Sequence, residues 1–139
     1  MQLHTYLSFN GNCREAMLFY QHCLGGELSF QTVGASPLSE EMPAAMRNHI
    51  VQATLTNDRF ILLASDLAAD QMLVRGNAVS LTLCCNSEDE IRNCYAKLCK
   101  GGAASHPLEN NFWGVLFGDL RDKYGNHWIL HYRQGPVSC

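Results

Sequence analysis

The feature that most constrains the fold is a module that occurs twice in the 139-residue chain. Residues 3–28, LHTYLSFNGNCREAMLFYQHCLGGEL, read as a strand, an amphipathic helix, a double-glycine stop and the start of a second strand. The same outline returns about 75 residues later in residues 78–103, AVSLTLCCNSEDEIRNCYAKLCKGGA. Repeated units bury their apolar faces against neighbouring structure, so the repeat indicates the architecture more firmly than the chemistry.

The first copy begins with a strand that alternates in character. His4, Tyr6 and Ser8 share one face, and mostly apolar residues share the other, which is typical of a half-buried strand. Asn12 followed by Glu15 predicts a variant of the helix-starting capping box. The helix stripe consists of Ala16, Met17, Phe19, Tyr20, Cys23 and Leu24. The double glycine then ends the helix and a second strand is expected over residues 27–33.

Three further segments complete the first half. Residues 34–48 contain two prolines and predict a long exposed loop, either a surface excursion or a cover over a binding site. Residues 49–55 and 59–64 flank Asn57-Asp58, which predicts a two-residue hairpin. The polar residues 65–76 are the natural connection to the second half.

The second half restarts with a β-rich run over residues 78–85. Ser87 and Glu90 form a capping-box pattern, and the helix they start ends at Gly101-Gly102. The apolar stripe of this helix consists of Ile91, Cys94, Tyr95, Leu98 and Cys99. His106 precedes Pro107 in an expected loop. Each half is therefore expected to be β-α-β-β-β.

The last strands are expected near residues 113–120 and 127–132, with a turn over residues 121–126 between them. Asp122-Lys123 with Gly125 is typical of turn chemistry, so we assign Asp122 no catalytic role. His127 and His131 share a strand face, but the strand rise places them roughly 13 Å apart. At that distance they cannot coordinate one metal ion without further ligands.

Composition narrows the function classes. A formal net charge of −3 without clustered Lys and Arg argues against nucleic acid as a partner. No apolar run approaches the ~20 residues of a membrane span, and the N-terminus lacks a signal-peptide pattern, so we expect a cytoplasmic protein away from membranes. Seven cysteines, an odd number without a CxxC motif, are interpreted chiefly as small core residues.

The chain length favours one domain over residues 1–139, with module 1 at about 1–66, a linker at about 67–76 and module 2 at about 77–134. The sequence resembles the PhnB-like branch of the vicinal oxygen chelate superfamily, which includes glyoxalase I, extradiol dioxygenases and bleomycin resistance proteins. The resemblance is carried by YLSFNGNCREAMLFYQHCLGGEL at residues 6–28, LLASD at 62–66 and FWG…DKYGNHW at 112–128.

This resemblance implies an α+β fold in which two tandem βαβββ modules form a curled mixed sheet, or half-barrel, around a cavity, with the helices outside. It also implies a homodimer. Some PhnB-like domains carry a demethylubiquinone methyltransferase label. No glycine-rich nucleotide loop follows a strand here, so the residues do not support S-adenosylmethionine binding.

Metal enzymes of the superfamily place a His on the first strand of each module and a Glu on a late strand. His4 occupies the first of these positions in this chain, whereas the approximate second-module counterpart is Ser80. The remaining ligand positions hold Leu63, Ala64, Ser65, Trp128 and Ile129. The PhnB-like branch commonly has a third-strand histidine where this chain has Gln52. We therefore expect no metal and no other cofactor, and leave open a partial site made by His4 and His49.

The resemblance implies a cavity lined from both modules. Its expected ligand-binding residues are His4, Tyr6, Ser8, Gln52, Thr82, Cys84, Trp113 and Trp128, with Phe112 as a further aromatic wall. The alternative that Trp113 and Trp128 are core residues is the stronger one, and His4 is a weak catalytic candidate. Such a lining suits a small organic ligand. The expected function is metal-free ligand binding. The alternatives are an enzyme of the superfamily (isomerase, lyase, transferase or dioxygenase) and a structural or regulatory dimer.

Overall fold

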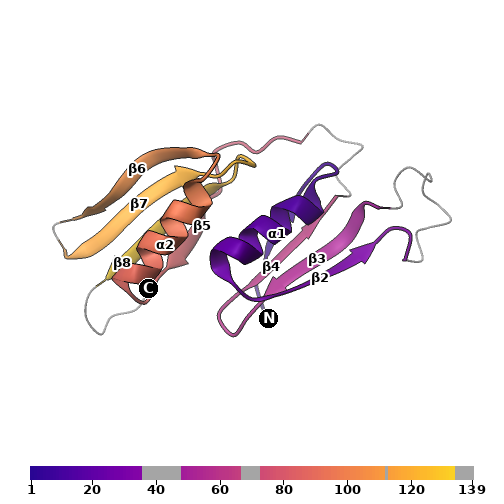
Figure 1. Ribbon diagram of the computed structural model, residues 1–139, viewed down its shortest axis with the longest axis horizontal. Coiled ribbons are helices and arrows are strands. Elements are labelled where there is room, and N and C mark those ends of the chain that lie inside the picture. The colour runs from indigo at the N-terminus through magenta and orange to yellow at the C-terminus, as the bar shows by residue number, and fades with distance from the viewer. Residues whose placement is uncertain (36–47, 67–72, 112, 134–139) are drawn as a thin grey trace. The chain divides into compact units, whose positions relative to one another are not determined.

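The computed structural model describes residues 1–35, 48–66, 73–111 and 113–133. These residues contain two helices and eight strands (Figure 1): β1 Thr5–Ser8, α1 Cys13–Leu24, β2 Glu27–Thr32, β3 Ile50–Thr56, β4 Ile61–Ser65, β5 Leu81–Cys84, α2 Glu88–Cys99, β6 Ala103–Asn110, β7 Val115–Arg121 and β8 His127–Arg133. The expected loop over residues 34–48 and linker over residues 67–76 lie largely outside this part of the chain, as does Phe112.

The chain divides into two compact units, Met1–Val74 (unit 1) and Arg75–Cys139 (unit 2). Each contains one four-stranded sheet, in the order β1-β4-β3-β2 in unit 1 and β5-β8-β7-β6 in unit 2. The first pair of each order is parallel and the other two pairs are antiparallel. The two orders are equivalent strand for strand, which confirms the α+β fold of two βαβββ modules.

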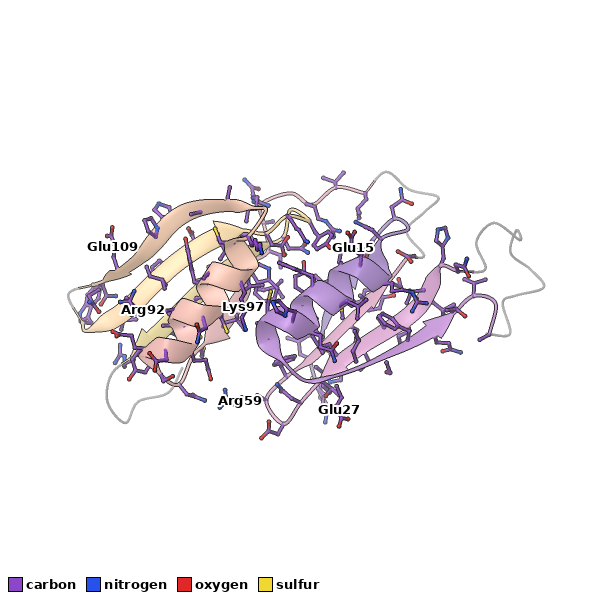
Figure 2. The ribbon with its side chains drawn as sticks, viewed as in Figure 1. Glu15, Glu27, Arg59, Arg92, Lys97 and Glu109 are labelled. Carbon is purple, nitrogen blue, oxygen red and sulfur yellow. The ribbon has the colours of Figure 1, made fainter. Side chains whose placement is uncertain are left out.

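In each unit the helix packs on one face of the sheet and the other face, called here the open face, carries the side chains that point away from the helix. On the helix side of unit 1, Leu7 and Phe9 are buried as the alternation predicts, whereas Leu3 and Thr5 before them are exposed. α1 contributes five buried residues, Cys13, Ala16, Met17, Tyr20 and Cys23. α2 contributes only Ile91 and Leu98 and presents exposed charged side chains such as Arg92 and Lys97 to solvent (Figure 2). Neither helix combines the length and apolarity needed to cross a membrane.

The backbone requires the two consecutive glycines for the same physical reasons in both units. The first glycine of each pair has positive φ, 78° at Gly25 and 79° at Gly101, which reverses the chain after the helix. The second lies against the strand that ends beside it: a Cβ would stand 2.9 Å from the Thr56 carbonyl oxygen at Gly26 and would overlap the Arg121 carbonyl oxygen at Gly102. In both copies of the motif, the first glycine therefore ends the helix and the second allows the backbone to pack closely against a neighbouring strand.

Three local expectations are corrected. The region of His106 and Pro107 is strand β6 rather than a loop, and it contains register shifts on both sides of His106. The β3–β4 connection has four residues, because Thr56 pairs with Ile61 and Asn57 Oδ1 accepts bonds from two backbone N–H groups in the turn. Asn12 precedes α1 without a side-chain cap bond.

The helix N-termini are satisfied differently in the two units. At α1, the buried carboxylate of Asp66 accepts from the backbone N–H groups of Gly11 and Cys13 and, with its other oxygen, from that of Ile50, all at 2.9–3.0 Å. At α2, the predicted capping box is confirmed. Ser87 Oγ accepts from Glu90 N–H at 3.0 Å, and Glu90 Oε1 accepts from Asn86 N–H at 3.1 Å.

Candidate functional site

The open face of unit 1 is a mostly neutral surface. Strand register places Tyr6, Leu63, Thr54 and Ser29 in one row across all four strands. Tyr6 is 52% exposed. Ser8 follows on β1 beside Ser65, and the exposed Gln52 pairs with Gln31. The predicted residues Tyr6, Ser8 and Gln52 thus belong to one sheet face that offers hydroxyl and amide groups around an apolar centre.

His4 and His49 are not brought together. His4 precedes β1, is exposed, and its Nε2 lies 3.1 Å from Gln2 Oε1. His49 lies beside Gly11, past the other end of β1: a Cβ on that glycine would be 3.4 Å from His49 Nε2. The two imidazoles therefore stand at opposite ends of the strand, and a shared ion has no basis in this arrangement.

The open face of unit 2 differs because it carries ionisable groups. Register places Thr82, Ile129, Asp119 and His106 in one row across the four strands. The neighbouring row contains Cys84, His131, Phe117 and Glu109. The predicted residues Thr82 and Cys84 are both exposed on this face. Cys84 Sγ lies 3.3 Å from His131 Nε2, and because Cys84 is disulfide-bonded we assign it no thiol chemistry.

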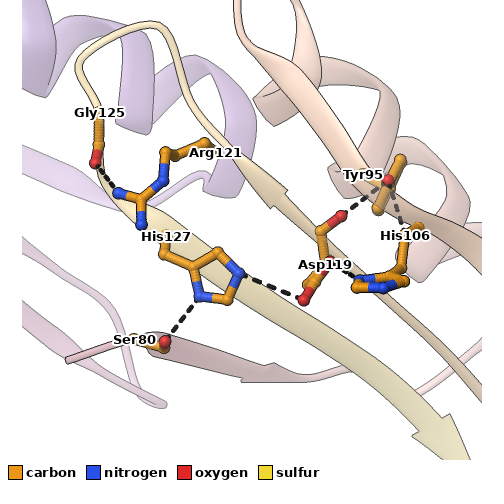
Figure 3. Close-up of polar contacts among 7 residues, drawn as sticks. All are labelled: Ser80, Tyr95, His106, Asp119, Arg121, Gly125 and His127. Atoms are coloured by element: carbon orange, nitrogen blue, oxygen red, sulfur yellow. Dashed lines mark hydrogen bonds and ion pairs between the residues drawn. The ribbon is translucent and has the colours of Figure 1, made fainter. Parts of the chain in front are cut away.

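Asp119 is the centre of a hydrogen-bonded cluster on this face (Figure 3). One carboxylate oxygen lies 2.8 Å from His106 Nδ1, and the other lies 3.2 Å from His127 Nε2. The second nitrogen of His127, Nδ1, lies 2.6 Å from Ser80 Oγ. The side chains of Asp119 and His127 are 15% and 20% exposed, against 76% for His106. A carboxylate at this depth therefore connects an exposed imidazole to a serine hydroxyl through a second imidazole.

In their neutral form, His106 and His127 each have one tautomer that fits the hydrogen bonds to Asp119. An ionised carboxylate only accepts, so His127 donates Nε2–H and His106 donates Nδ1–H to Asp119. The lone pair of His127 Nδ1 then remains as the acceptor for the Ser80 O–H. In this arrangement the Asp119 carboxylate orients His127, and the unprotonated nitrogen of His127 faces a hydroxyl. His127 can therefore act as a base that removes a proton from that hydroxyl or from a bound ligand.

The neighbouring residues hold this cluster in place. Tyr95 Oη on α2 lies 3.0 Å from the carbonyl oxygens of both His106 and Asp119 and donates its proton between them (Figure 3). Burial raises the pKa of Tyr95, with smaller contributions from Cys99 and Asp119, which keeps the phenol protonated. Arg121 pairs with His127 across the sheet but directs Nη1 to the Gly125 carbonyl oxygen at 2.7 Å.

Gly118 in β7 leaves space for the bulged strand β6 to approach closely. A Cβ at this position would lie 2.9 Å from a methyl carbon of Leu108 and 3.0 Å from the His106 carbonyl oxygen. The close approach of β6 to β7 at the bulge therefore depends on glycine. It sets the position from which His106 reaches Asp119.

The two tryptophans lie away from this cluster. Trp128 is 2% exposed on the helix side of the sheet, where its Nε1–H donates to Asp122 Oδ2 at 2.8 Å. Asp122 also accepts from the N–H groups of Tyr124 and Asn126, which confirms its role in the turn. Trp113 is 76% exposed in the β6–β7 connection. Trp128 is therefore a core residue in unit 2, and only Trp113 is open to a ligand.

The thiols outside this face are structural in position. Cys13 is buried under α1, and burial, with a smaller contribution from Asp66, raises its pKa to about 12. On unit 2, a side-chain hydrogen bond from Cys85 lowers the pKa of Cys94, against the opposing effect of burial. The interpretation of the cysteines as core residues therefore describes Cys13 well and the Cys85–Cys94 pair less well.

Sequence reasoning missed Asp119 and misplaced His106. A signal was present, because residues 117, 119 and 121 on one strand and 127, 129 and 131 on the next alternate onto one face. Their contact also required the register of β7 with β8 and the bulge in β6, which depend on long-range pairing. The Ser80 counterpart of His4 was found as a position but not as a hydrogen-bonding partner.

The described parts of the chain hold no group of three or more His, Cys, Asp or Glu side chains placed to bind a metal ion. Nucleotide-binding folds use free N–H groups at a helix start. Here, Asp66 takes that place at α1, and Glu90 with Ser87 takes it at α2. These residues do not fit a nucleotide-type cofactor at either helix start.

Known proteins resemble the chain over nearly its full length. The family described as 3-demethylubiquinone-9 3-methyltransferase matches residues 1–131. Protein YjdN of Escherichia coli (strain K12) is 29% identical over 149 residues, 99% of this chain and 100% of that protein. The crystal structure of protein PA1353 from Pseudomonas aeruginosa is 34% identical with a TM-score of 0.86, covering 97% of this chain and 99% of that one.

Two further structures place the fold more broadly. The putative 3-demethylubiquinone-9 3-methyltransferase PhnB protein from Bacillus cereus is 27% identical with a TM-score of 0.74, covering 95% of this chain and 99% of that one. A glyoxalase/bleomycin resistance protein from Albidiferax ferrireducens T118 is 16% identical with a TM-score of 0.62, covering 96% of this chain and 99% of that one. At that identity the likeness concerns the fold alone.

Proposed function

Because the chain belongs to the 3-demethylubiquinone-9 3-methyltransferase family, the PhnB-like branch of the vicinal oxygen chelate superfamily, we propose that it binds a small organic molecule on the open faces of its sheets. The observation that carries the proposal is the row Thr82, Ile129, Asp119 and His106 with its Ser80–His127 extension. Polar groups beside apolar side chains on a rigid sheet are what a small organic ligand requires.

The polar groups define the ligand chemistry. Ser80, His127 and Asp119 offer a hydroxyl, an imidazole and a carboxylate within one hydrogen-bonded chain. Phe117, 40% exposed in the next row, offers an aromatic surface. We therefore propose a ligand with an apolar body and one hydrogen-bonding group. The open face of unit 1, taken by itself, offers Tyr6, Ser8 and Gln52 as neutral contacts for a ligand of the same kind.

The proposal includes a metal-free homodimer in the cytoplasm. The dimer is proposed by analogy with the superfamily, in which dimers are the rule. Methyl transfer is not part of the proposal. The family description names a methyltransferase, but both helix starts are occupied by side chains of the protein.

A catalytic function is the second candidate, as an isomerase, lyase, transferase or dioxygenase of the superfamily. One observation favours it: His127 is held by a carboxylate and has a lone pair directed at a hydroxyl. His4, the weak catalytic candidate of the sequence, is exposed, and its Nε2 lies 3.1 Å from the Oε1 of the nearby Gln2. The His4→Ala variant is therefore expected to leave activity on any identified substrate unchanged.

Native mass spectrometry of the untreated protein tests the proposal. We expect the dimer mass, no bound metal, and an organic adduct that the His127→Ala variant loses. The matched control is His22→Ala, which removes an exposed imidazole on α1 and should retain the adduct. A stoichiometric divalent metal would overturn metal-free binding. An adduct that survives His127→Ala would move the site away from unit 2, and an empty protein would favour a structural dimer.

A further inference from the structure

We propose that Ser80 is a nucleophile that accepts acyl groups from small activated esters, with His127 as its base and Asp119 as the positioning carboxylate. The proposal rests on the proposed function, because the ester would bind on the same open face of unit 2. It adds covalent chemistry to what would otherwise be a binding site.

The geometry carries this assignment. Ser80 Oγ lies 2.6 Å from His127 Nδ1, and His127 Nε2 lies 3.2 Å from Asp119 Oδ2. A nucleophile, its base and the group that orients the base are thus within hydrogen-bond reach in the required order. Ser80 directly precedes β5, His127 begins β8 and Asp119 lies in β7, so three neighbouring strands of one sheet position them (Figure 3).

Exposure differs among the three in the way the reaction requires. Ser80 is exposed, so an ester carbonyl can reach its oxygen. His127 and Asp119 are largely covered, at 20% and 15% side-chain exposure, which limits competition from water for their mutual hydrogen bond. His106 holds the other carboxylate oxygen of Asp119 at 2.8 Å and so restrains its rotation.

The protonation states follow from the same network. Asp119 accepts Nε2–H of His127, which leaves Nδ1 unprotonated towards Ser80. When the serine proton moves to Nδ1, His127 becomes a cation beside the Asp119 carboxylate, and the ion pair stabilises that state. Reversal of the tautomer would place Nδ1–H against the hydroxyl and remove the base.

The reaction balances without any further component except water. Ser80 Oγ attacks the ester carbonyl carbon while its proton passes to His127 Nδ1. The bond from that carbon to the leaving oxygen breaks, and the leaving alcohol takes the proton back from Nδ1. Water then attacks the acyl-serine by the same route, giving a carboxylic acid and free Ser80. No electron transfer is involved.

The substrate class follows from the surroundings. Ile129 lies one position along the face from His127, and Phe117, 40% exposed, lies in the neighbouring row. These side chains favour a short apolar acyl group over a charged one. The ester must have a good leaving group, because the chemistry assigned here consists of a base and a nucleophile.

The test uses p-nitrophenyl acetate with the full-length protein. We expect release of p-nitrophenol and one acetyl group on the peptide that contains Ser80, located by tandem mass spectrometry. Ser80→Ala should abolish this acetylation. His127→Gln should slow it about 100-fold or more, the usual contribution of a general base. Asp119→Asn should slow it by a smaller but measurable factor.

Two controls match these variants. Ser105→Ala removes an exposed hydroxyl from β6, and His22→Ala removes an exposed imidazole from α1; both should react as the wild type does. Acetylation elsewhere with Ser80 unmodified, or a rate unaffected by His127→Gln, would overturn the proposal. Circular dichroism verifies that each variant is folded.

The outcome is separable from the proposed function. An organic adduct that persists in the Ser80→Ala protein, together with absent Ser80 acetylation in the wild type, would overturn the nucleophile and leave ligand binding intact. Acetylation of Ser80 in a wild-type protein that carries no organic adduct in native mass spectrometry would support the nucleophile and contradict the binding proposal.

Discussion

Unit 1 and unit 2 are built on one strand order but use their polar residues in different ways. In unit 1 the principal carboxylate, Asp66, is buried and accepts from two backbone N–H groups at the start of α1 and from that of Ile50 at the start of β3. In unit 2 the helix start is satisfied locally by Ser87 and Glu90, and the carboxylate of Asp119 faces the open side between two imidazoles.

The difference shows how a repeated scaffold can separate stability from chemistry. A carboxylate that satisfies backbone donors cannot also serve a ligand, and unit 1 commits Asp66 in this way. Unit 2 caps its helix with residues adjacent in sequence, which leaves a carboxylate on the sheet available to orient His127. We infer that unit 1 provides mainly structure and neutral contacts and that unit 2 provides the acid–base groups.

Removal of the Asp66 carboxylate is the change with the largest expected effect. Asp66→Ala leaves the N–H groups of Gly11, Cys13 and Ile50 without their acceptor in a buried site, at about 1–3 kcal/mol for each group. We expect a loss of roughly 3 kcal/mol or more in the free energy of unfolding, measured by urea denaturation. Asp58→Ala, in the exposed β3–β4 turn, is the control and should change little. Equal effects of the two would refute the structural role of Asp66.

The second glycine of each double-glycine pair ranks next. Gly102→Ala would place a Cβ on the Arg121 carbonyl, so the backbone must move, at about 1–3 kcal/mol for overpacking of this kind. Gly26→Ala should cost less because its nearest atom is 2.9 Å away. In thermal unfolding, both variants should melt below Gly25→Ala, which meets no atom within 4 Å and carries only the penalty for positive φ. A Gly25→Ala variant that melts lowest would contradict this order.

High pH should weaken unit 1 through Cys13. Its folded pKa of about 12 lies above the ordinary value of 9.0, so the folded state retains a proton that the unfolded chain releases. The contribution is complete below pH 9.0 and is lost as the pH rises towards 12. The free energy of unfolding should therefore fall more steeply above pH 9.0 in the wild type than in Cys13→Ala. Parallel curves for the two proteins would exclude this contribution.

The two helix caps give the smallest and most direct contrast. Ser87→Ala removes the bond to Glu90 N–H and should cost about 1 kcal/mol. Asn12→Ala removes no side-chain cap bond and should have an effect near zero on the free energy of unfolding. Urea denaturation of the pair measures the difference. If Asn12→Ala were as costly as Ser87→Ala, the assignment of Asp66 as the substitute for a local cap would be wrong.

These contrasts also explain what the sequence could predict. The βαβββ repeat, the Ser87–Glu90 cap and the turn role of Asp122 depend on residues close in sequence, and each was recognised. The similarly spaced pair Asn12–Glu15 does not form the predicted cap, because Asp66, 54 positions away from Asn12, accepts from the N–H groups at this helix start. Tertiary contacts of that kind override a local signal.

The candidate site was predictable only in part. Alternation along β1 and β5 identified Tyr6, Ser8 and Thr82 on open faces, because strand periodicity is a local property. Asp119 was missed because its importance depends on which strands pair and in which register. Trp128 was interpreted either as a cavity wall or as a core residue. The alternation that places His127 on the open face directs Trp128 towards the core.

The claim that unit 2 holds the acid–base groups is tested most directly by nitrogen-15 NMR of the histidine side chains, which reports the tautomer of each imidazole. The account predicts that His127 carries its proton on Nε2 and His106 on Nδ1, and that Asp119→Asn alters the signals of both. The His22 signals should be unchanged in that variant. A His127 protonated on Nδ1, or His127 signals that do not respond to Asp119→Asn, would contradict it.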